Sequence, residues 1–172
     1  MPKGFAMLIL NAALLLLLPH PAQGEMQHRL GIGAHYWKAL TDVDPDEFDQ
    51  DGLGWLITYK LVPSSILNFQ LDFEVLPKGY AGSDHRVVSP QGFVLAGDQI
   101  YGALGVGVHY SDGDFADKAF FILRAGFDME LLPSIYTDIN VNYRFEEWDS
   151  GEVKPSVDTL TLGAAVRFRL SS

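Results

Sequence analysis

The sequence predicts an all-β protein, an eight-stranded antiparallel transmembrane β-barrel, and three observations lead to this fold class. Residues 67–75 alternate apolar and polar side chains without a break, which places the two kinds on opposite faces of an extended strand. The same pattern recurs along the chain behind an N-terminal segment typical of a secretory signal. Long polar connections also alternate with short turns, as they do in transmembrane barrels.

Residues 1–24 are predicted to be a cleavable signal peptide. Lys3 gives a basic start, an apolar run follows, and residues 22–24 supply the small side chains for cleavage before Glu25. The alternative is an anchoring helix, but the run is too short, since a spanning helix needs about 20 apolar residues. No other segment is predicted to form a spanning helix. In a membrane, the domain 25–172 must therefore be a closed sheet, because its backbone groups need partners within the protein.

The composition excludes several classes of function. The chain contains no Cys, so it forms neither disulfides nor thiolate metal sites. Its net charge of −10 argues against nucleic acid as a partner, because such binding needs a basic surface. We expect no cofactor.

Four strands are predicted in the first half of the mature chain. In the first three, bulky apolar residues occupy every second position, with polar or small residues between them. The fourth contains Pro90, which cannot donate to the sheet and therefore indicates a bulge or a position at the rim. The predicted ranges are about 28–38, 54–62, 67–75 and 87–95.

Four more strands are predicted in the second half. In one of them, Ile139, Val141 and Tyr143 alternate with Asn140 and Asn142. The lengths match a tilted crossing of a bilayer by a strand. The predicted ranges are about 100–110, 119–131, 135–145 and 158–170.

The connections predict the orientation of the barrel. Short turns are expected on the periplasmic side and long loops outside, which places both termini in the periplasm. The short turns are expected at 62–65, 96–99 and 132–134, and the long polar loops at 39–53, 77–86, 111–118 and 146–157.

Alternation alone does not separate a membrane barrel from a soluble, lipocalin-like barrel. Two observations favour lipid on the outside. The polar faces carry many glycines, which suit a narrow and crowded lumen. The apolar faces carry more large side chains than the interior of eight strands can hold.

With the polar faces directed inward, the lumen is predicted to hold a network of nearly balanced charges. Charges in such a low-dielectric interior need to be paired and hydrogen-bonded, so a mutually paired plug is the simpler hypothesis and an open pore the alternative. The predicted members are Arg29, Lys60, Asp72, Glu74, Arg124, Asp128, Glu130, Asp138, Arg144, Arg167 and Arg169.

Several segments resemble the small outer-membrane β-barrel family that includes the OmpA-type membrane domain, OmpX and OmpW. They are residues 101–107, residues 124–127 followed by 132–134, and residues 142–145. The terminal strand segment 166–170 resembles the signal recognised by the barrel-assembly machinery. The resemblance implies a barrel in the cell outer membrane, in contact with lipid and lipopolysaccharide. It implies little about activity, since the family includes adhesins, anchors, solute conduits and a few lipid-modifying enzymes.

Three further features are candidate sites. His109 and Ser111 resemble the His-x-Ser pair of lipid A deacylases, but a rim histidine is the favoured interpretation. The loop acids Asp42, Asp44, Asp46 and Glu47 are a candidate weak cation site. The favoured interpretation is an acidic loop in contact with solvent, so no metal site is predicted. Aromatic residues near the outer strand ends are predicted to form an interfacial belt: Tyr36, Trp37, Trp55, Tyr110, Tyr143 and Phe145.

The sequence therefore predicts a monomeric outer-membrane barrel with a structural or surface-interaction role, and not an enzyme. The alternatives are a conduit for small or hydrophobic solutes and, less favoured, a lipid A-modifying hydrolase.

Overall fold

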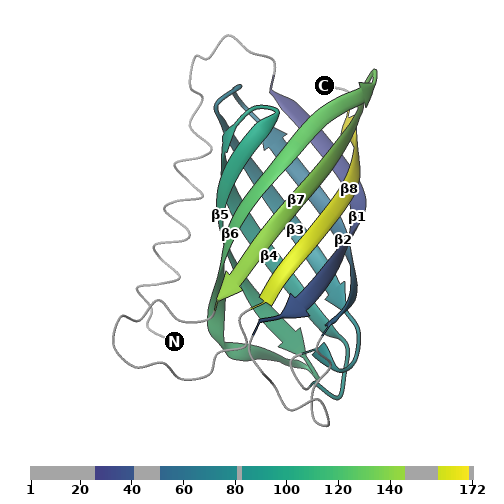
Figure 1. The fold of residues 1–172 in the computed structure, drawn as a ribbon, viewed down its shortest axis with the longest axis vertical. Helices are drawn as coiled ribbons and strands as arrows, with labels where there is room; N and C mark the ends of the chain where they lie inside the picture. The colour runs from purple at the N-terminus through teal and green to yellow at the C-terminus, as the bar shows by residue number, and fades with distance from the viewer. Residues whose placement is uncertain (1–25, 41–50, 81–82, 146–158, 171–172) are drawn as a thin grey trace, which may run out of the picture.

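The computed structural model describes residues 26–40, 51–80, 83–145 and 159–170, so the predicted signal peptide lies outside the described residues. Each strand is hydrogen-bonded to the next one in the chain, and β8 closes on β1 (Figure 1). Every neighbouring pair is antiparallel, which confirms the predicted fold class. The strands are β1 (Gln27–Ala39), β2 (Asp51–Val62), β3 (Leu67–Leu76), β4 (Val87–Gly97), β5 (Ile100–Ser111), β6 (Asp114–Leu132), β7 (Ile135–Phe145) and β8 (Thr159–Leu170).

The two ends of the barrel differ in how the strands are joined. At one end, which we call the turn end, short turns at 63–66, 98–99 and 133–134 connect the strands. The first and last described residues, Met26 and Leu170, also lie at this end, because Gln27 is paired with Val62 and His28 with Leu170. The other four connections leave from the opposite end, which we call the loop end.

One connection at the loop end contradicts the prediction. Instead of a long loop at 111–118, strands β5 and β6 continue until Ser111 pairs with Asp114. The turn between them is Asp112-Gly113, with φ angles of 53° and 91°. Positive φ at both central residues is the geometry of a two-residue hairpin turn, for which Asp-Gly is a favoured sequence. The prediction of a long loop was wrong because the polar residues on both sides of Asp112-Gly113 are paired as strands.

Pro90 lies where the pairing of β4 with β5 is interrupted. The ladder runs as far as Gln91 opposite Gly107 and resumes at Val88 opposite Tyr110. On its other side Pro90 is paired with Phe73 of β3. The missing donor of Pro90 therefore falls at an irregularity of the sheet, where it is tolerated.

Most polar side chains of the strands face the interior, and most large apolar side chains face outward. In β3, Asp72 and Glu74 are buried, whereas Leu71 and Phe73 are about half exposed, at 51% and 53%. This distribution is the reverse of that in a water-soluble protein, in which large apolar side chains are buried. Among the described residues, no helix is long and apolar enough to cross a membrane.

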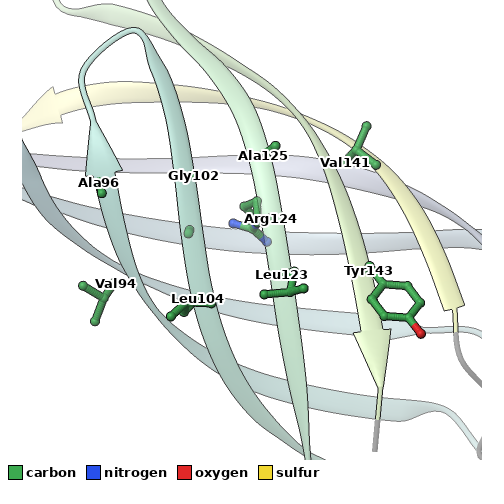
Figure 2. A pocket seen from close by; sticks show the side chains of 10 residues that line it. Val94, Ala96, Gly102, Leu104, Leu123, Arg124, Ala125, Val141 and Tyr143 are labelled. Atoms are coloured by element: carbon green, nitrogen blue, oxygen red, sulfur yellow. The ribbon is translucent and has the colours of Figure 1, made fainter.

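The outer surface has a shallow hollow of about 610 Å³ over β4, β5 and β6 (Figure 2). The small residues Ala96, Gly102 and Ala125 are paired across these strands and form its floor. Leu104 and Leu123 stand beside it, and a Cβ added to Gly102 would meet nothing within 4 Å. Most of the lining side chains are exposed and apolar, so the hollow lies on the outward side of the wall.

Candidate functional site

The lumen contains most of the charged residues predicted to lie there. Glu130 and Arg169 are the exceptions, because their side chains are 42% and 35% exposed at the turn end. Arg29 is nearly buried, with its side chain 11% exposed. The fully buried members are Lys60, Asp72, Glu74, Arg124, Asp128, Asp138, Arg144 and Arg167.

Two ion pairs connect opposite walls of the barrel. Arg144 Nη2 on β7 lies 2.5 Å from Glu74 Oε2 on β3, and Lys60 Nζ on β2 lies 2.5 Å from Asp128 Oδ2 on β6. In each pair the two strands are as far apart as the closed order allows. These side chains therefore cross the interior instead of lining it.

Near the turn end, two aspartates gather the surrounding cations. Asp128 also accepts a hydrogen bond from Arg29 Nη1 at 3.2 Å. Asp138 accepts hydrogen bonds from Arg167 Nη1 at 3.2 Å and from the Tyr101 hydroxyl at 2.7 Å. Arg167 Nη2 also donates a hydrogen bond to the side-chain oxygen of Gln70 on β3. Arg167, which belongs to β8, thus connects its own strand to β7 and β3.

The middle of the lumen is occupied by Arg124 and Asp72. Arg124 Nη2 lies 3.0 Å from Asp72 Oδ2, and its Nε donates a hydrogen bond to the side-chain oxygen of Asn142. Gln70 Nε2 donates to both carboxylate oxygens of Asp72. The buried carboxylate is therefore neutralised by a cation and held by an amide, as a charge in a low-dielectric interior requires.

Towards the loop end, Glu74 accepts hydrogen bonds from three strands. Besides Arg144, the donors are Gln91 Nε2 at 2.7 Å and the His35 ring, whose Nδ1 lies 2.8 Å away. Glu74 is 0% exposed, so its charge is stabilised by these protein groups alone. Such charge-assisted hydrogen bonds are the stronger kind.

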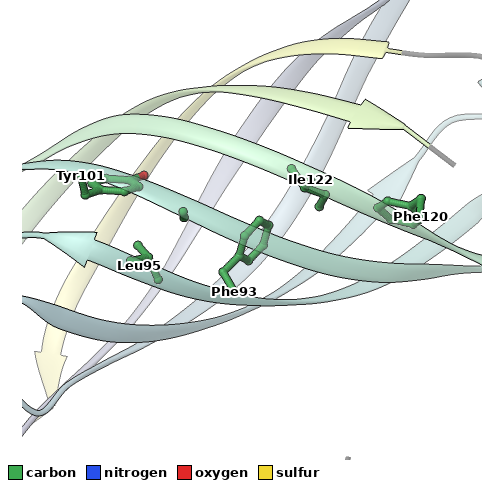
Figure 3. Close-up of a cluster of buried hydrophobic side chains, with 6 residues drawn as sticks. Phe93, Leu95, Tyr101, Phe120 and Ile122 are labelled. Atoms are coloured by element: carbon green, nitrogen blue, oxygen red, sulfur yellow. The ribbon is translucent and has the colours of Figure 1, made fainter. Parts of the chain in front are cut away.

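One side of the lumen is apolar, which the sequence analysis did not predict. Phe93, Leu95, Tyr101, Phe120 and Ile122 form a buried cluster on β4, β5 and β6 (Figure 3). Cations from the charged side lie over these rings. The Arg124 guanidinium is 3.8 Å from the Phe93 ring centroid, and Lys60 Nζ is 5.2 Å from that of Tyr101. Cation–π attraction therefore connects the apolar and charged sides of the lumen.

Three of these rings lie over glycines of the neighbouring strand. The directly paired residues are Phe93 with Gly105, Phe120 with Gly107 and Tyr101 with Gly126. A Cβ on any of the three glycines would come within 2.4 to 2.5 Å of a ring atom. The inward-facing glycines are therefore needed so that large aromatic side chains fit inside a narrow barrel.

Four aromatic rings close the loop end of the lumen, and we call them the aromatic cap: Trp37, Tyr80, His109 and Phe120. The Trp37 and Tyr80 rings meet edge to face at 4.8 Å, and the His109 and Phe120 rings stack at 4.3 Å. Tyr80 and His109 lie 5.5 Å apart and join the two pairs. Trp37 is 1% exposed, so its predicted place in an interfacial belt was wrong, whereas Tyr36, Trp55 and Tyr110 are exposed.

The two other candidate sites predicted from the sequence are the His109–Ser111 pair and the acidic loop. His109 Nδ1 lies 2.6 Å from the hydroxyl of Ser89, while Ser111 is hydrogen-bonded to Ser83 instead. The His109–Ser111 arrangement considered from the sequence is therefore not formed. Among the described residues no group of His, Asp or Glu is arranged to hold a metal ion. The loop acids Asp42, Asp44, Asp46 and Glu47 lie outside the described residues.

No family model and no curated protein sequence matches this chain. Solved structures do share its fold. Neisserial surface protein A aligns with a TM-score of 0.53 and 13% sequence identity, over 86% of this chain and all of the other. The fold is that of the small outer-membrane β-barrels.

Two further outer-membrane barrels align less well. The attachment invasion locus protein Ail of Yersinia pestis, in complex with the heparin analogue sucrose octasulfate, has a TM-score of 0.48 and 16% identity over 87% of this chain and 100% of its own. The N-terminal β-barrel domain of Pseudomonas aeruginosa OprF has a TM-score of 0.47 and 9% identity over 84% of this chain and 100% of its own. The predicted resemblance to small outer-membrane barrels is confirmed at the level of fold.

Proposed function

We propose that this chain is a monomeric outer-membrane barrel with a structural or surface-interaction role and a lumen plugged by its own side chains. The observation that supports this proposal is the pair of ion bridges that cross the whole interior, Glu74–Arg144 and Lys60–Asp128. The aromatic cap adds a second obstruction at the loop end. A solute would have to break paired charges in a low-dielectric interior in order to pass.

The outer surface supports a place in a lipid bilayer. Its exposed side chains form a continuous apolar band around strands β1 to β8, far larger than the apolar patches that soluble monomers expose. A transmembrane barrel needs such a band. Its members include Leu30, Ile32, Trp55, Ile57, Leu71, Phe73, Ile100, Leu104, Leu123, Ile139, Leu162 and Phe168.

The proposed orientation places the turn end in the periplasm and the loop end outside the cell. In this orientation the signal peptide, 1–24, is removed and the chain reaches the membrane through the barrel-assembly machinery. The loop end then faces lipopolysaccharide and the cell exterior, where surface partners bind. No cofactor is part of this proposal.

We do not propose a hydrolase. A His–Ser nucleophile must reach its substrate, but the hydroxyl that His109 contacts belongs to Ser89, which is 0% exposed. Mass spectrometry of lipid A from cells with and without the protein tests this point. A change in acylation that disappears in Ser89→Ala or Ser111→Ala would show an enzyme.

Conductance in planar bilayers tests the plug. The native protein should give no resolved single-channel steps. Lys60→Ala combined with Asp128→Ala removes a pair that crosses the lumen and should raise the conductance, whereas the lipid-facing control Leu104→Ala should not. Regular single-channel steps in the native protein would overturn the plug and favour the conduit for small or hydrophobic solutes.

A further inference from the structure

A pocket of about 290 Å³ lies at the loop end, outside the aromatic cap. It forms where the segment after β3 meets the hairpin of β5 and β6. Its volume is at the lower limit of the range, about 300–1,000 Å³, found for small-molecule sites. The residues that determine its chemistry are Tyr80, Ser83, His109, Ser111, Asp114 and Phe115.

An irregularity of the sheet opens this pocket. The β5–β6 register shifts between Val108 and Tyr110, which are paired with Ala119 and Phe115. Residues 116–118 therefore stand opposite His109 alone, and Ala116 of this bulge lines the pocket. Bulges of this kind redirect side chains and are common beside functional sites.

The walls of the pocket are held by contacts within the protein. The hydroxyls of Ser83 and Ser111 lie 3.0 Å apart and connect the segment after β3 to the hairpin. Tyr80 is 4% exposed and rests on Trp37, while His109 is held by Ser89. A ligand would therefore meet a largely preformed surface, which reduces the entropy lost on binding.

The lining favours a positively charged organic group. Asp114 supplies a carboxylate, and no Lys or Arg is among the described lining residues. The rings of Tyr80 and of Phe115, which is 58% exposed, line the pocket, and organic cations are attracted to aromatic rings. The carboxylate and the rings would thus both attract the positive charge of one bound ligand.

Other small ligands fit this lining less well. A hard metal ion needs six or more oxygen ligands, whereas Asp114 is the only carboxylate among the described lining residues. An inorganic anion would meet the Asp114 carboxylate and no Lys or Arg among the described lining residues. The nearby Arg144, which is hydrogen-bonded to Tyr80, is buried in the lumen and already paired with Glu74. Aromatic walls instead suit a cation whose charge is spread over methyl groups.

From these features we propose that the pocket binds small organic ammonium ions, held by Asp114 and by the rings of Tyr80 and Phe115. The pocket shares Tyr80 and His109 with the aromatic cap but lies on its outer side, so its ligand arrives from the loop end without crossing the barrel. The inference therefore stands or falls independently of the conductance measurement.

Calorimetric titration of the purified full-length protein in an uncharged maltoside detergent tests the proposal. Choline chloride is the probe, and its uncharged tert-butyl analogue is the matched control ligand. We expect saturable binding of choline and much weaker binding of the analogue. Asp114→Asn and Phe115→Leu should each weaken choline binding by about fivefold or more, as loss of an ionic or cation–π contact requires.

Two control variants separate the pocket from general electrostatic attraction. Asp112→Asn removes a charge from the same hairpin, but Asp112 faces His85 at 3.7 Å and does not line the pocket. Asp98→Asn removes a charge at the turn end. Both should bind choline as the native protein does, and heat-dependent mobility on gels shows whether each variant is folded. Absence of saturable choline binding, equal binding of the analogue, or equal weakening by Asp112→Asn and Asp114→Asn would each overturn the proposal.

Discussion

Arg144 and Glu74 meet 2.5 Å apart in the lumen, although they come from strands β7 and β3 on opposite walls. Both side chains are buried, so water contributes little to the stability of either charge. Each ion therefore depends on its partner and on the neutral groups around it. A buried pair of this kind is costly to break, whatever its net contribution to folding.

Replacing Glu74 with glutamine should strongly destabilise the barrel. Arg144 would remain buried without its counter-ion, and the contacts with His35 and Gln91 would weaken. We expect the free energy of unfolding to fall by about 3–5 kcal/mol, measured by urea unfolding in lipid vesicles. The control is Glu130→Gln at the exposed turn end, where loss of the pair with Arg169 should cost less than about 1 kcal/mol. An equal loss of unfolding free energy in the two variants would show that burial does not determine the cost of breaking these pairs.

Replacing both members of the pair should be less harmful than replacing one. In Glu74→Leu with Arg144→Met, no uncompensated charge remains inside, and the new side chains lie near the apolar cluster around Phe120. The double variant should unfold at higher urea concentration than either single variant. A double-variant cost equal to the sum of the single costs would show that the two residues are not coupled.

Two glycines provide a test of packing inside and outside the wall. A Cβ on Gly126 would lie 2.5 Å from the Tyr101 ring, whose hydroxyl donates to Asp138. Gly126→Ala should therefore destabilise the barrel by about 1–3 kcal/mol, as overpacking does. Gly102→Ala, where the Cβ would meet nothing within 4 Å on the outer surface, should change stability by less than about 0.5 kcal/mol. Thermal or urea unfolding of the two variants side by side would show whether the rings require glycine beneath them.

The absence of cysteine in the chain allows a direct test of orientation. Single cysteines can be introduced in the β5–β6 hairpin by Asp112→Cys and in the turn between β4 and β5 by Asp98→Cys. A membrane-impermeant maleimide added to intact cells should label the first, and the second only after the outer membrane is permeabilised. Labelling in the reverse order would place the loop end in the periplasm.

The strands could be predicted from the sequence because alternation is a local property. Residues 67–75 and 138–145 alternate without a break, and the structure places β3 and most of β7 there. Lumen-facing charges follow from the same alternation, since a residue's parity along its strand decides its face. The pairing of particular cations with particular carboxylates cannot be predicted from alternation, because Lys60 and Asp128 are brought together only by closure of the sheet.

Other features of the site depend on relations between distant strands. Phe93 and Phe120 lie inside because glycines on β5 leave room for their rings, and this relation appears only once the register is known. Trp37 is buried because Tyr80 lies against it, which a count of strand-end aromatics does not reveal. The hairpin at Asp112-Gly113 is different, since the Asp-Gly pair that forms its turn is a local signal present in the sequence.

The bridges across the lumen also bear on the order in which the barrel can assemble. Strands β2 and β6, like β3 and β7, are not neighbours, so pairing of adjacent strands alone does not bring their charges together. We therefore expect these bridges to form only as the sheet closes, when β8 pairs with β1 and the charges lose their contact with water. Strand pairing and charge neutralisation are thereby coupled, so that a barrel with one strand out of register would leave buried ions without partners.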